Sequence, residues 1–150
     1  MRATVITLLL LLALGGVQAQ NVSSSEKQKQ QIDKMVSQMQ NYFMVILTKG
    51  PNQNQESAEL EKLKNEHLAN MMKMANMGKL VLAGPFMENG NMRGIFIFDV
   101  ETEAEVKQLA DTDPMVKSGR MNYEVHPWFG PKALKELNKI YRNNLEEGKK

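Results

Sequence analysis

Residues 66–86, EHLANMMKMANMGKLVLAGPF, carry the end of a helix, a glycine stop and a strand in direct succession. The first part has apolar residues three and four positions apart, which is the spacing of one face of an α-helix. Gly78 follows the last of these turns, and glycine readily adopts the left-handed conformation that ends a helix. The apolar run over residues 79–86 then predicts a strand. The other elements can be placed outward from this step.

Two further strands flank this stretch. Residues 42–48, YFMVILT, form a short apolar run with β-branched and aromatic side chains, closed by a Lys-Gly-Pro sequence, and this pattern is typical of a strand. A polar loop leads from it to a helix that we expect over residues 57–77. Residues 92–100 predict a third strand. The Asn89-Gly90 pair before it favours a tight hairpin turn, so the second and third strands should be antiparallel neighbours.

The second half of the chain carries two helix-start signals and a fourth strand. Residues 102–105, TEAE, match a capping box and predict a helix that begins there. Asp113 followed by Pro114 is typical of an N-cap with proline at the first helical position, which predicts one more helical turn. Residues 121–125 alternate apolar and polar side chains and predict a fourth strand. A last helix is expected from Gly130 onward.

This order, helix, then β-α-β-β-α-β, then helix, predicts an α+β protein with a ferredoxin-like core. In that fold, four antiparallel strands carry two helices on one face. The strands over residues 42–48 and 92–100 carry large apolar residues at both parities, whereas a sheet with one face in water should alternate. Either a second copy of the sheet or the terminal helices must therefore cover the other face. We expect a homodimer in which the sheets pack face to face.

The first nineteen residues have the organisation of a secretory signal peptide. Arg2 provides a short basic region, residues 5–14 an apolar run, and Val17-Gln18-Ala19 the small residues that signal peptidase requires. The run is shorter than the about 20 apolar residues that span a bilayer. We therefore expect cleavage before Gln20 and an exported protein, periplasmic or extracellular, without membrane contact after cleavage. An uncleaved membrane anchor is the alternative.

The remaining 131 of the 150 residues suffice for one domain with its own core. We divide them into a polar helical lead-in over 20–41, a domain over 42–129, and a C-terminal helix with a charged tail over 130–150. The chain has no cysteine, so its core must hold the fold without disulfides. A formal net charge of +2 without a basic stripe argues against nucleic acid as a partner.

His67 is the main candidate for chemistry. It lies in the apolar stripe of the helix expected over residues 57–77. An imidazole changes its charge near neutral pH, which suits it to proton transfer. If Asp113 accepts a hydrogen bond from one ring nitrogen, the other nitrogen can move a proton on a bound molecule, which suffices for isomerisation, elimination or lactone chemistry without a cofactor. The structural alternative is a packed core histidine and an aspartate that only caps a helix.

Four further side chains are candidates for binding a small-molecule ligand: Tyr42, Arg93, Tyr123 and His126. The tyrosines offer hydroxyls but are also typical packing residues of strands, and the arginine either binds a carboxylate or keeps the hairpin soluble. The histidine shares strand parity with Glu124 and either lines a pocket or faces water.

No spacing is diagnostic of a zinc site, and no phosphate loop, nucleophile elbow, flavin motif or nicotinamide motif occurs. We therefore expect neither a metal nor a cofactor.

Several short motifs together indicate a family. They are the strand YFMVIL from Tyr42, the helix motif Asn65-Glu66-His67-Leu68, the step Met77-Gly78-Lys79-Leu80, and the turn Asp113-Pro114-Met115. With these motifs the chain resembles the YCII-related (YciI-like) family of small dimeric α+β-barrel proteins. The resemblance covers about residues 42–127 and leaves both terminal segments outside.

The resemblance implies a face-to-face dimer around a cavity, with His67 and Asp113 at the active site of an enzyme. A dehydrochlorinase that acts on an aromatic ring has been described among the family's members. This chain has Met115 where the family commonly has Phe, and Lys64 near the place of a frequent arginine, which weakens the expectation of an anionic substrate. A non-catalytic ligand-binding or protein-interaction module on the same barrel remains the alternative.

Overall fold

The computed structural model describes residues 24–140 and 143. The expected signal peptide and most of the expected charged tail lie outside the described residues. The chain divides into two units, Met1–Gln38 and Met39–Lys150. In the first unit, residues 24–37 form a helix whose side chains are exposed. Among the described residues, no helix is long and apolar enough to cross a membrane.

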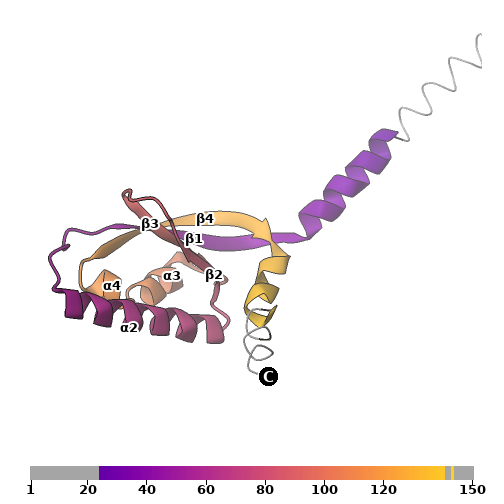
Figure 1. Ribbon diagram of the computed structural model, residues 1–150. Coiled ribbons are helices and arrows are strands. Elements are labelled where there is room, and N and C mark those ends of the chain that lie inside the picture. Colours follow the sequence, from indigo (N-terminus) through magenta and orange to yellow (C-terminus); the bar gives the residue numbers. More distant parts are fainter. Residues whose placement is uncertain (1–23, 141–142, 144–150) are drawn as a thin grey trace, which may run out of the picture. The chain divides into compact units, whose positions relative to one another are not determined.

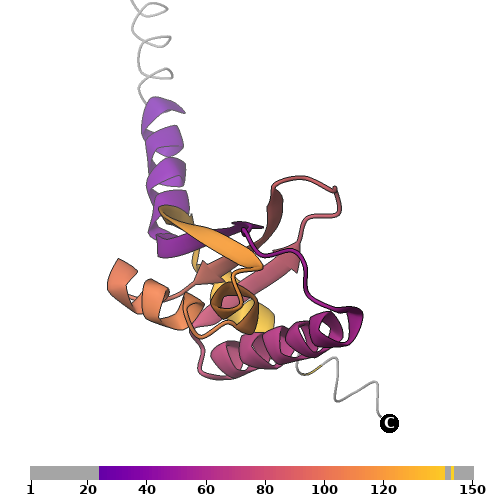
Figure 2. The same cartoon turned by 90° about the vertical axis from the view of Figure 1, so that its left-hand side faces the viewer.

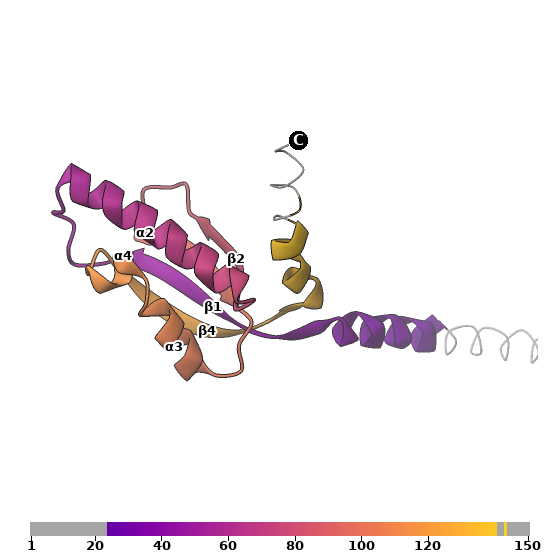
Figure 3. The same ribbon diagram turned by 90° about the horizontal axis from the view of Figure 1, so that it is seen from below.

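The second unit contains a four-stranded antiparallel sheet with the strand order β2-β3-β1-β4. The strands are β1 (Met39–Lys49), β2 (Leu80–Pro85), β3 (Met92–Phe98) and β4 (Met121–Pro131). The helices are α2 (Ser57–Asn76), α3 (Glu103–Ala110) and α4 (Pro114–Lys117). These helices lie on one side of the sheet (Figures 1 and 2), and Figure 3 views the molecule from that side. This arrangement confirms the predicted α+β, ferredoxin-like fold.

Helix α2 ends at the predicted glycine. Gly78 has a φ of 73°, and its N–H donates to the carbonyl of Ala75. The N–H of Lys79 donates to the carbonyl of Met74, so two carbonyls of the last turn find donors. The chain then enters β2 directly, which places α2 against the sheet.

The cap of α3 and the antiparallel pairing of β2 with β3 are confirmed as well. The hydroxyl of Thr102 accepts a hydrogen bond from the N–H of Glu105 at 3.2 Å, and α3 begins at the next residue. β2 and β3 pair antiparallel, as predicted, with Gly84 opposite Ile95. Their connection spans residues 86–91 and neither Asn89 nor Gly90 has a positive φ, so the tight Asn-Gly turn that the sequence predicts is not formed. The cap and the strand pairing depend on segments close together in the chain, which is why the sequence pattern predicts them.

The main core lies between the helices and the sheet. Its buried side chains come from β1, β2, β3, α2 and α3: Val45, Leu47, Met74, Leu80, Phe96, Phe98 and Val106. Burying a side chain of this size stabilises the fold by about 1.5–3 kcal/mol relative to leaving it in water. This core fixes α2 and α3 on the sheet and thereby sets the position of the candidate site.

The opposite face of the sheet carries a smaller core. Its members are the buried Tyr42, Val81 and Ile97 and the partly buried Met44, Leu82, Trp128 and Leu134. Leu134 belongs to η1 (Lys132–Glu136), so a C-terminal element covers part of this face. Ile46 and Ile95, which also point to this face, stay half-buried in the described chain.

Three predicted boundaries are wrong. The pattern predicts a fourth strand over 121–125 and a helix from Gly130, but β4 continues to Pro131, a 3₁₀-helix follows over 132–136, and α-helical structure begins at 137. β4 pairs with β1 along its whole length, so β1 also begins three residues early, at Met39, inside the predicted lead-in. Pro127 interrupts the alternation of the sequence, yet it is tolerated because β4 lies at the edge of the sheet.

Candidate functional site

His67 on α2 and Asp113, the residue before α4, lie next to each other. Nδ1 of His67 is 2.7 Å from Oδ2 of Asp113. The Asp113 side chain is fully buried, while that of His67 keeps 16 % of its surface exposed. Because a carboxylate can only accept, the imidazole donates from Nδ1. Nε2 is then the nitrogen that can exchange a proton with a bound molecule.

The second carboxylate oxygen of Asp113 caps α4. Oδ1 accepts a hydrogen bond from the N–H of Met115 at 2.8 Å, and Pro114 occupies the first position of the helix. Each oxygen therefore has its own partner. The capping role and the contact with His67 are present together, so they are not alternatives in this protein.

The face of the His67 ring packs on Phe96 of β3. The ring centroids are 6.0 Å apart and the planes differ by 25°. Phe96 is buried and meets Phe98 edge to face, with centroids 5.8 Å apart. Phe96 of the sheet thus restrains one face of the imidazole ring. The sequence pattern did not single out Phe96, because its position opposite Val45 follows only from the strand register.

A second contact joins α2 to the turn that carries Asp113. Nδ2 of Asn70, one helical turn after His67, donates to Oγ1 of Thr112 at 3.0 Å. The Thr112 hydroxyl in turn donates to the carbonyl of Leu109 at 2.6 Å. Neither Asn70 nor Thr112 carries a motif, so nothing in the sequence pattern marks them.

Tyr123 contacts the same turn from β4. Its hydroxyl donates to Oδ1 of Asp111 at 2.7 Å. Burial of the ring, and then the hydrogen bond and negative charge of Asp111, raise the pKa of Tyr123 to about 12. The hydroxyl of this predicted ligand-binding residue is thus bonded to Asp111, which lies two positions before Asp113 in the chain.

The other three predicted ligand-binding residues lie apart from His67. The Tyr42 hydroxyl donates to the carbonyl of Pro131 at 3.0 Å. Burial, and secondarily the charge of Asp99, raise the pKa of Tyr42. The guanidinium of Arg93 donates to the carbonyl of Gly90 within the hairpin.

His126 lies on the opposite face of the sheet. The register places it beside Met44 of β1, while His67 packs against the helix-bearing face. Its Nε2 is 3.6 Å from a carboxylate oxygen of Glu124, and both side chains are exposed. Of the six predicted site residues, only His67 and Asp113 contact each other.

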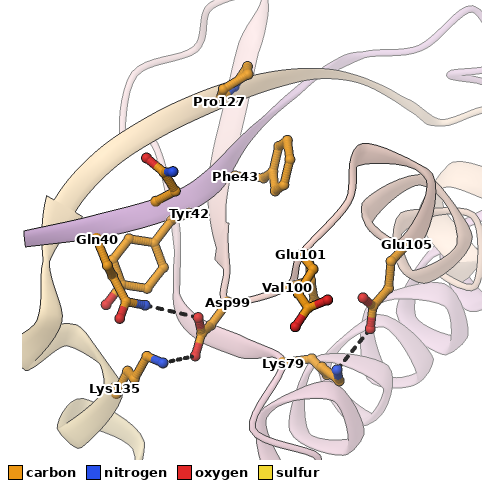
Figure 4. A pocket seen from close by; sticks show the side chains of 11 residues that line it. Gln40, Tyr42, Phe43, Lys79, Asp99, Val100, Glu101, Glu105, Pro127 and Lys135 are labelled. Carbon is orange, nitrogen blue, oxygen red and sulfur yellow. Dashed lines mark hydrogen bonds and ion pairs between the residues drawn. The ribbon is translucent and has the colours of Figure 1, made fainter.

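A cavity of about 850 Å³ opens at the end of the sheet near Tyr42 (Figure 4). Asp99 is held there by Nε2 of Gln40 and by Nζ of Lys135, each at 2.9 Å. Lys79 forms an ion pair with Glu105 at 2.8 Å on another wall. The charges that line this cavity are thus largely paired with each other.

A second cavity of about 680 Å³ lies between α2, β2 and the C-terminal segment. Its lining is apolar except for Asn138, which donates to the carbonyl of Leu80. Neither cavity is lined by His67 or Asp113. Within the described residues, no group of three or more acidic residues and histidines could hold a metal ion.

Comparison with known proteins places the folded unit in a family. Residues 41–129 match the family model of the YCII-related domain. A solved structure with a similar chain is 5-chloro-2-hydroxyhydroquinone dehydrochlorinase from Burkholderia phenoliruptrix AC1100, in complex with 2,5-dihydroxybenzoquinone. The two chains are 23% identical, the match covers 58% of this chain and 92% of that chain, and the TM-score is 0.45. A separate comparison with curated proteins found no match.

Proposed function

This chain belongs to the YCII-related domain family, and we propose that it is a small-molecule enzyme in which His67 transfers protons and Asp113 orients it. One observation carries this proposal. A partly exposed imidazole donates over 2.7 Å to a fully buried carboxylate whose other oxygen is bonded elsewhere. An aspartate that served only to cap α4 would not need a histidine as a second partner.

The pair supports general acid–base chemistry. Nε2 of His67 removes a proton from the substrate and returns it to another atom in an isomerisation, or the substrate expels a leaving group in an elimination. The imidazolium formed in this step is stabilised by the negative charge of Asp113. Proton transfer from a positioned side chain typically accelerates a reaction by about 10²–10⁴-fold. In lactone hydrolysis, Nε2 takes a proton from the water that adds to the carbonyl carbon and returns it to the ring oxygen as the C–O bond breaks. None of these steps requires a cofactor.

A ligand screen tests the proposal. Melting temperatures of the wild type, His67→Gln and His126→Gln are measured with a library rich in hydroxylated aromatic compounds and lactones. His126 is the matched control, because it is the other histidine of the chain and lies on the opposite face of the sheet. We expect ligands that stabilise the wild type and His126→Gln but not His67→Gln, and these are then assayed for turnover. Ligands that stabilise all three proteins equally would contradict the proposal.

A non-catalytic binding module is the second candidate. It is favoured by the position of the two cavities, since neither is lined by His67. If this candidate holds, a ligand of the cavity near Tyr42 loses its effect in Lys135→Ala, which removes one charged wall, and keeps it in His67→Gln. The same screen therefore separates the two candidates.

We further propose that two copies pack through the face of the sheet opposite the helices. The support is the chemistry of that face, on which Ile46 and Ile95 are half-buried apolar residues beside the exposed Glu124. Apolar residues at both parities are costly unless both faces are covered. Because η1 reaches only one part of this face, a second copy is the occupant that we propose for the rest.

We propose in addition that the protein is exported after cleavage before Gln20. The support is the sequence of the first nineteen residues, with a basic start, an apolar run and small residues at the cleavage site. Mass spectrometry of the protein made in a secreting host tests this proposal. A mature N-terminus at Gln20 is expected, and an intact N-terminus in the membrane fraction would contradict it.

A further inference from the structure

The turn between α3 and α4 consists of three residues, Asp111, Thr112 and Asp113, which we call the Asp-Thr-Asp corner. Its backbone is satisfied by local hydrogen bonds. The three N–H groups donate to the carbonyls of Lys107, Leu109 and Ala110 at 2.8, 3.1 and 3.0 Å. The N–H groups of the corner therefore need no side-chain acceptor, so the contacts of its side chains with other elements are additional to those of the turn.

Each side chain of the corner bonds to a different partner on another element. Asp113 accepts from His67 of α2, Thr112 accepts from Asn70 of α2, and Asp111 accepts from Tyr123 of β4. The corner is thus held from the helix layer and from the sheet at the same time. A turn that only joined α3 to α4 would not require three such bonds in a row.

The two contacts with α2 are made from the same side of that helix. His67 and Asn70 are three positions apart, so they lie one turn apart on the same side of α2. Oγ1 of Thr112 is 3.2 Å from the amide oxygen of Asn70 but only 2.6 Å from the carbonyl of Leu109. The single hydroxyl proton therefore points to Leu109, and Thr112 accepts from the amide nitrogen of Asn70.

The contact with β4 persists over a wide pH range. The pKa of Tyr123 is raised to about 12, first by burial and then by Asp111, so the hydroxyl stays a donor well above neutral pH. Tyr123 itself is anchored in the sheet opposite Leu47, a buried core residue. The bond to Asp111 therefore ties the corner to a rigid part of the fold.

We propose that Asn70 and Tyr123 are positioning residues, which hold the Asp-Thr-Asp corner from two sides so that Asp113 stays in hydrogen-bond distance of His67. This inference rests on the proposed function of the His67–Asp113 pair. The tautomer of an imidazole is set by the bond that its other nitrogen makes. A corner that moves away from α2 therefore leaves His67 as a mixture of tautomers, with Nε2 protonated part of the time and unable to accept a proton.

The tautomer can be measured directly by NMR of protein labelled with ¹⁵N-histidine. The chain contains two histidines, so His126 is an internal reference in every sample. The variants are Asn70→Ala, Tyr123→Phe, and Thr112→Val, which removes the hydroxyl at nearly constant shape. Thr112→Ser keeps the hydroxyl and is the rescue variant. Asn65→Ala is the matched control, because it removes an exposed amide from the same helix.

We expect Nδ1–H to predominate at His67 in the wild type, Asn65→Ala and Thr112→Ser. The ratio of Nδ1–H to Nε2–H should fall about three- to tenfold in Asn70→Ala, Tyr123→Phe and Thr112→Val, which is the effect of losing one hydrogen bond. The ratio at His126 should not change. Once a substrate is known, kcat should fall in the same variants while KM stays the same.

The outcomes separate this inference from the proposed function. A wild type that carries Nδ1–H at His67, with variants that fold and show the same ratio, would overturn the positioning role alone. A wild type with the proton on Nε2 would overturn the proposed pair and the positioning role with it. If Thr112→Val does not fold, Asn70→Ala and Tyr123→Phe still decide between these outcomes.

Discussion

Nδ1 of His67 lies 2.7 Å from Oδ2 of Asp113, although 46 positions separate the two residues in the chain. The contact joins α2 to the first turn of α4, because Asp113 is also the N-cap of that helix. One carboxylate therefore serves both the candidate chemistry and the fold. Substitutions of Asp113 should affect both, whereas substitutions of His67 should affect mainly the chemistry.

Replacement of Asp113 should destabilise the protein in proportion to the lost acceptors. Asp113→Ala removes the cap of α4 and leaves buried donors without a partner, so the free energy of unfolding should fall by about 1–3 kcal/mol. Asp113→Asn keeps an oxygen for the N–H of Met115 and should cost less. Urea unfolding measures both, with Glu88→Ala in the exposed hairpin as the control. Equal stability of Asp113→Ala and the control would contradict the capping role.

Gly50 should not tolerate a side chain. A Cβ at this position would overlap the backbone carbonyl of Gly119, in the turn between α4 and β4, and backbone atoms cannot move aside easily. Gly50→Ala should therefore lower the free energy of unfolding by about 1–3 kcal/mol. Gly84→Ala is the control, because no atom lies within 4 Å of a Cβ there. Similar urea midpoints for the two variants would contradict this close approach.

Stability should decline at high pH because of Tyr123. Its pKa is raised from 10.0 to about 12 by burial and by its bond to Asp111. A raised folded pKa means that the folded state holds the proton more tightly, so this stabilisation is complete below about pH 10 and is lost as the pH rises through about 12. Comparing unfolding at about pH 9 and about pH 11.5 should show a smaller decline in Tyr123→Phe than in the wild type. Identical declines would rule out Tyr123 as the cause.

The proposed homodimer should be sensitive to a charge on the open face of the sheet. Ile46→Glu places a carboxylate beside Glu124 on that face, and burying it against a second copy would be costly. Sedimentation should show a dimer for the wild type and a monomer for Ile46→Glu. Met87→Glu is the matched control, because Met87 is 93% exposed in the hairpin. A wild-type monomer, or a dimer that survives in Ile46→Glu, would refute the proposed interface.

Local signals determined much of the fold in advance. The stop at Gly78 and the caps at Thr102 and Asp113 each act through backbone groups within a few residues. Such contacts form in the same way wherever the segment lies, so the sequence pattern predicts them, and the order of elements then indicates a ferredoxin-like sheet. The length of β4 was predicted wrongly, because Pro127 breaks the alternation while pairing with β1 extends the strand.

The candidate site, like the fold, was predictable from the sequence only in part. The sequence by itself determined that His67 belongs to the apolar side of α2 and that Asp113 caps a helical turn. Only the tertiary structure decided that these two side chains meet, that Phe96 supports the ring, and that Asn70 reaches Thr112. These contacts depend on the register of the sheet and on how α2 packs over it, which are set by the whole core. An aspartate before a proline has the same local pattern whether or not a histidine lies opposite it.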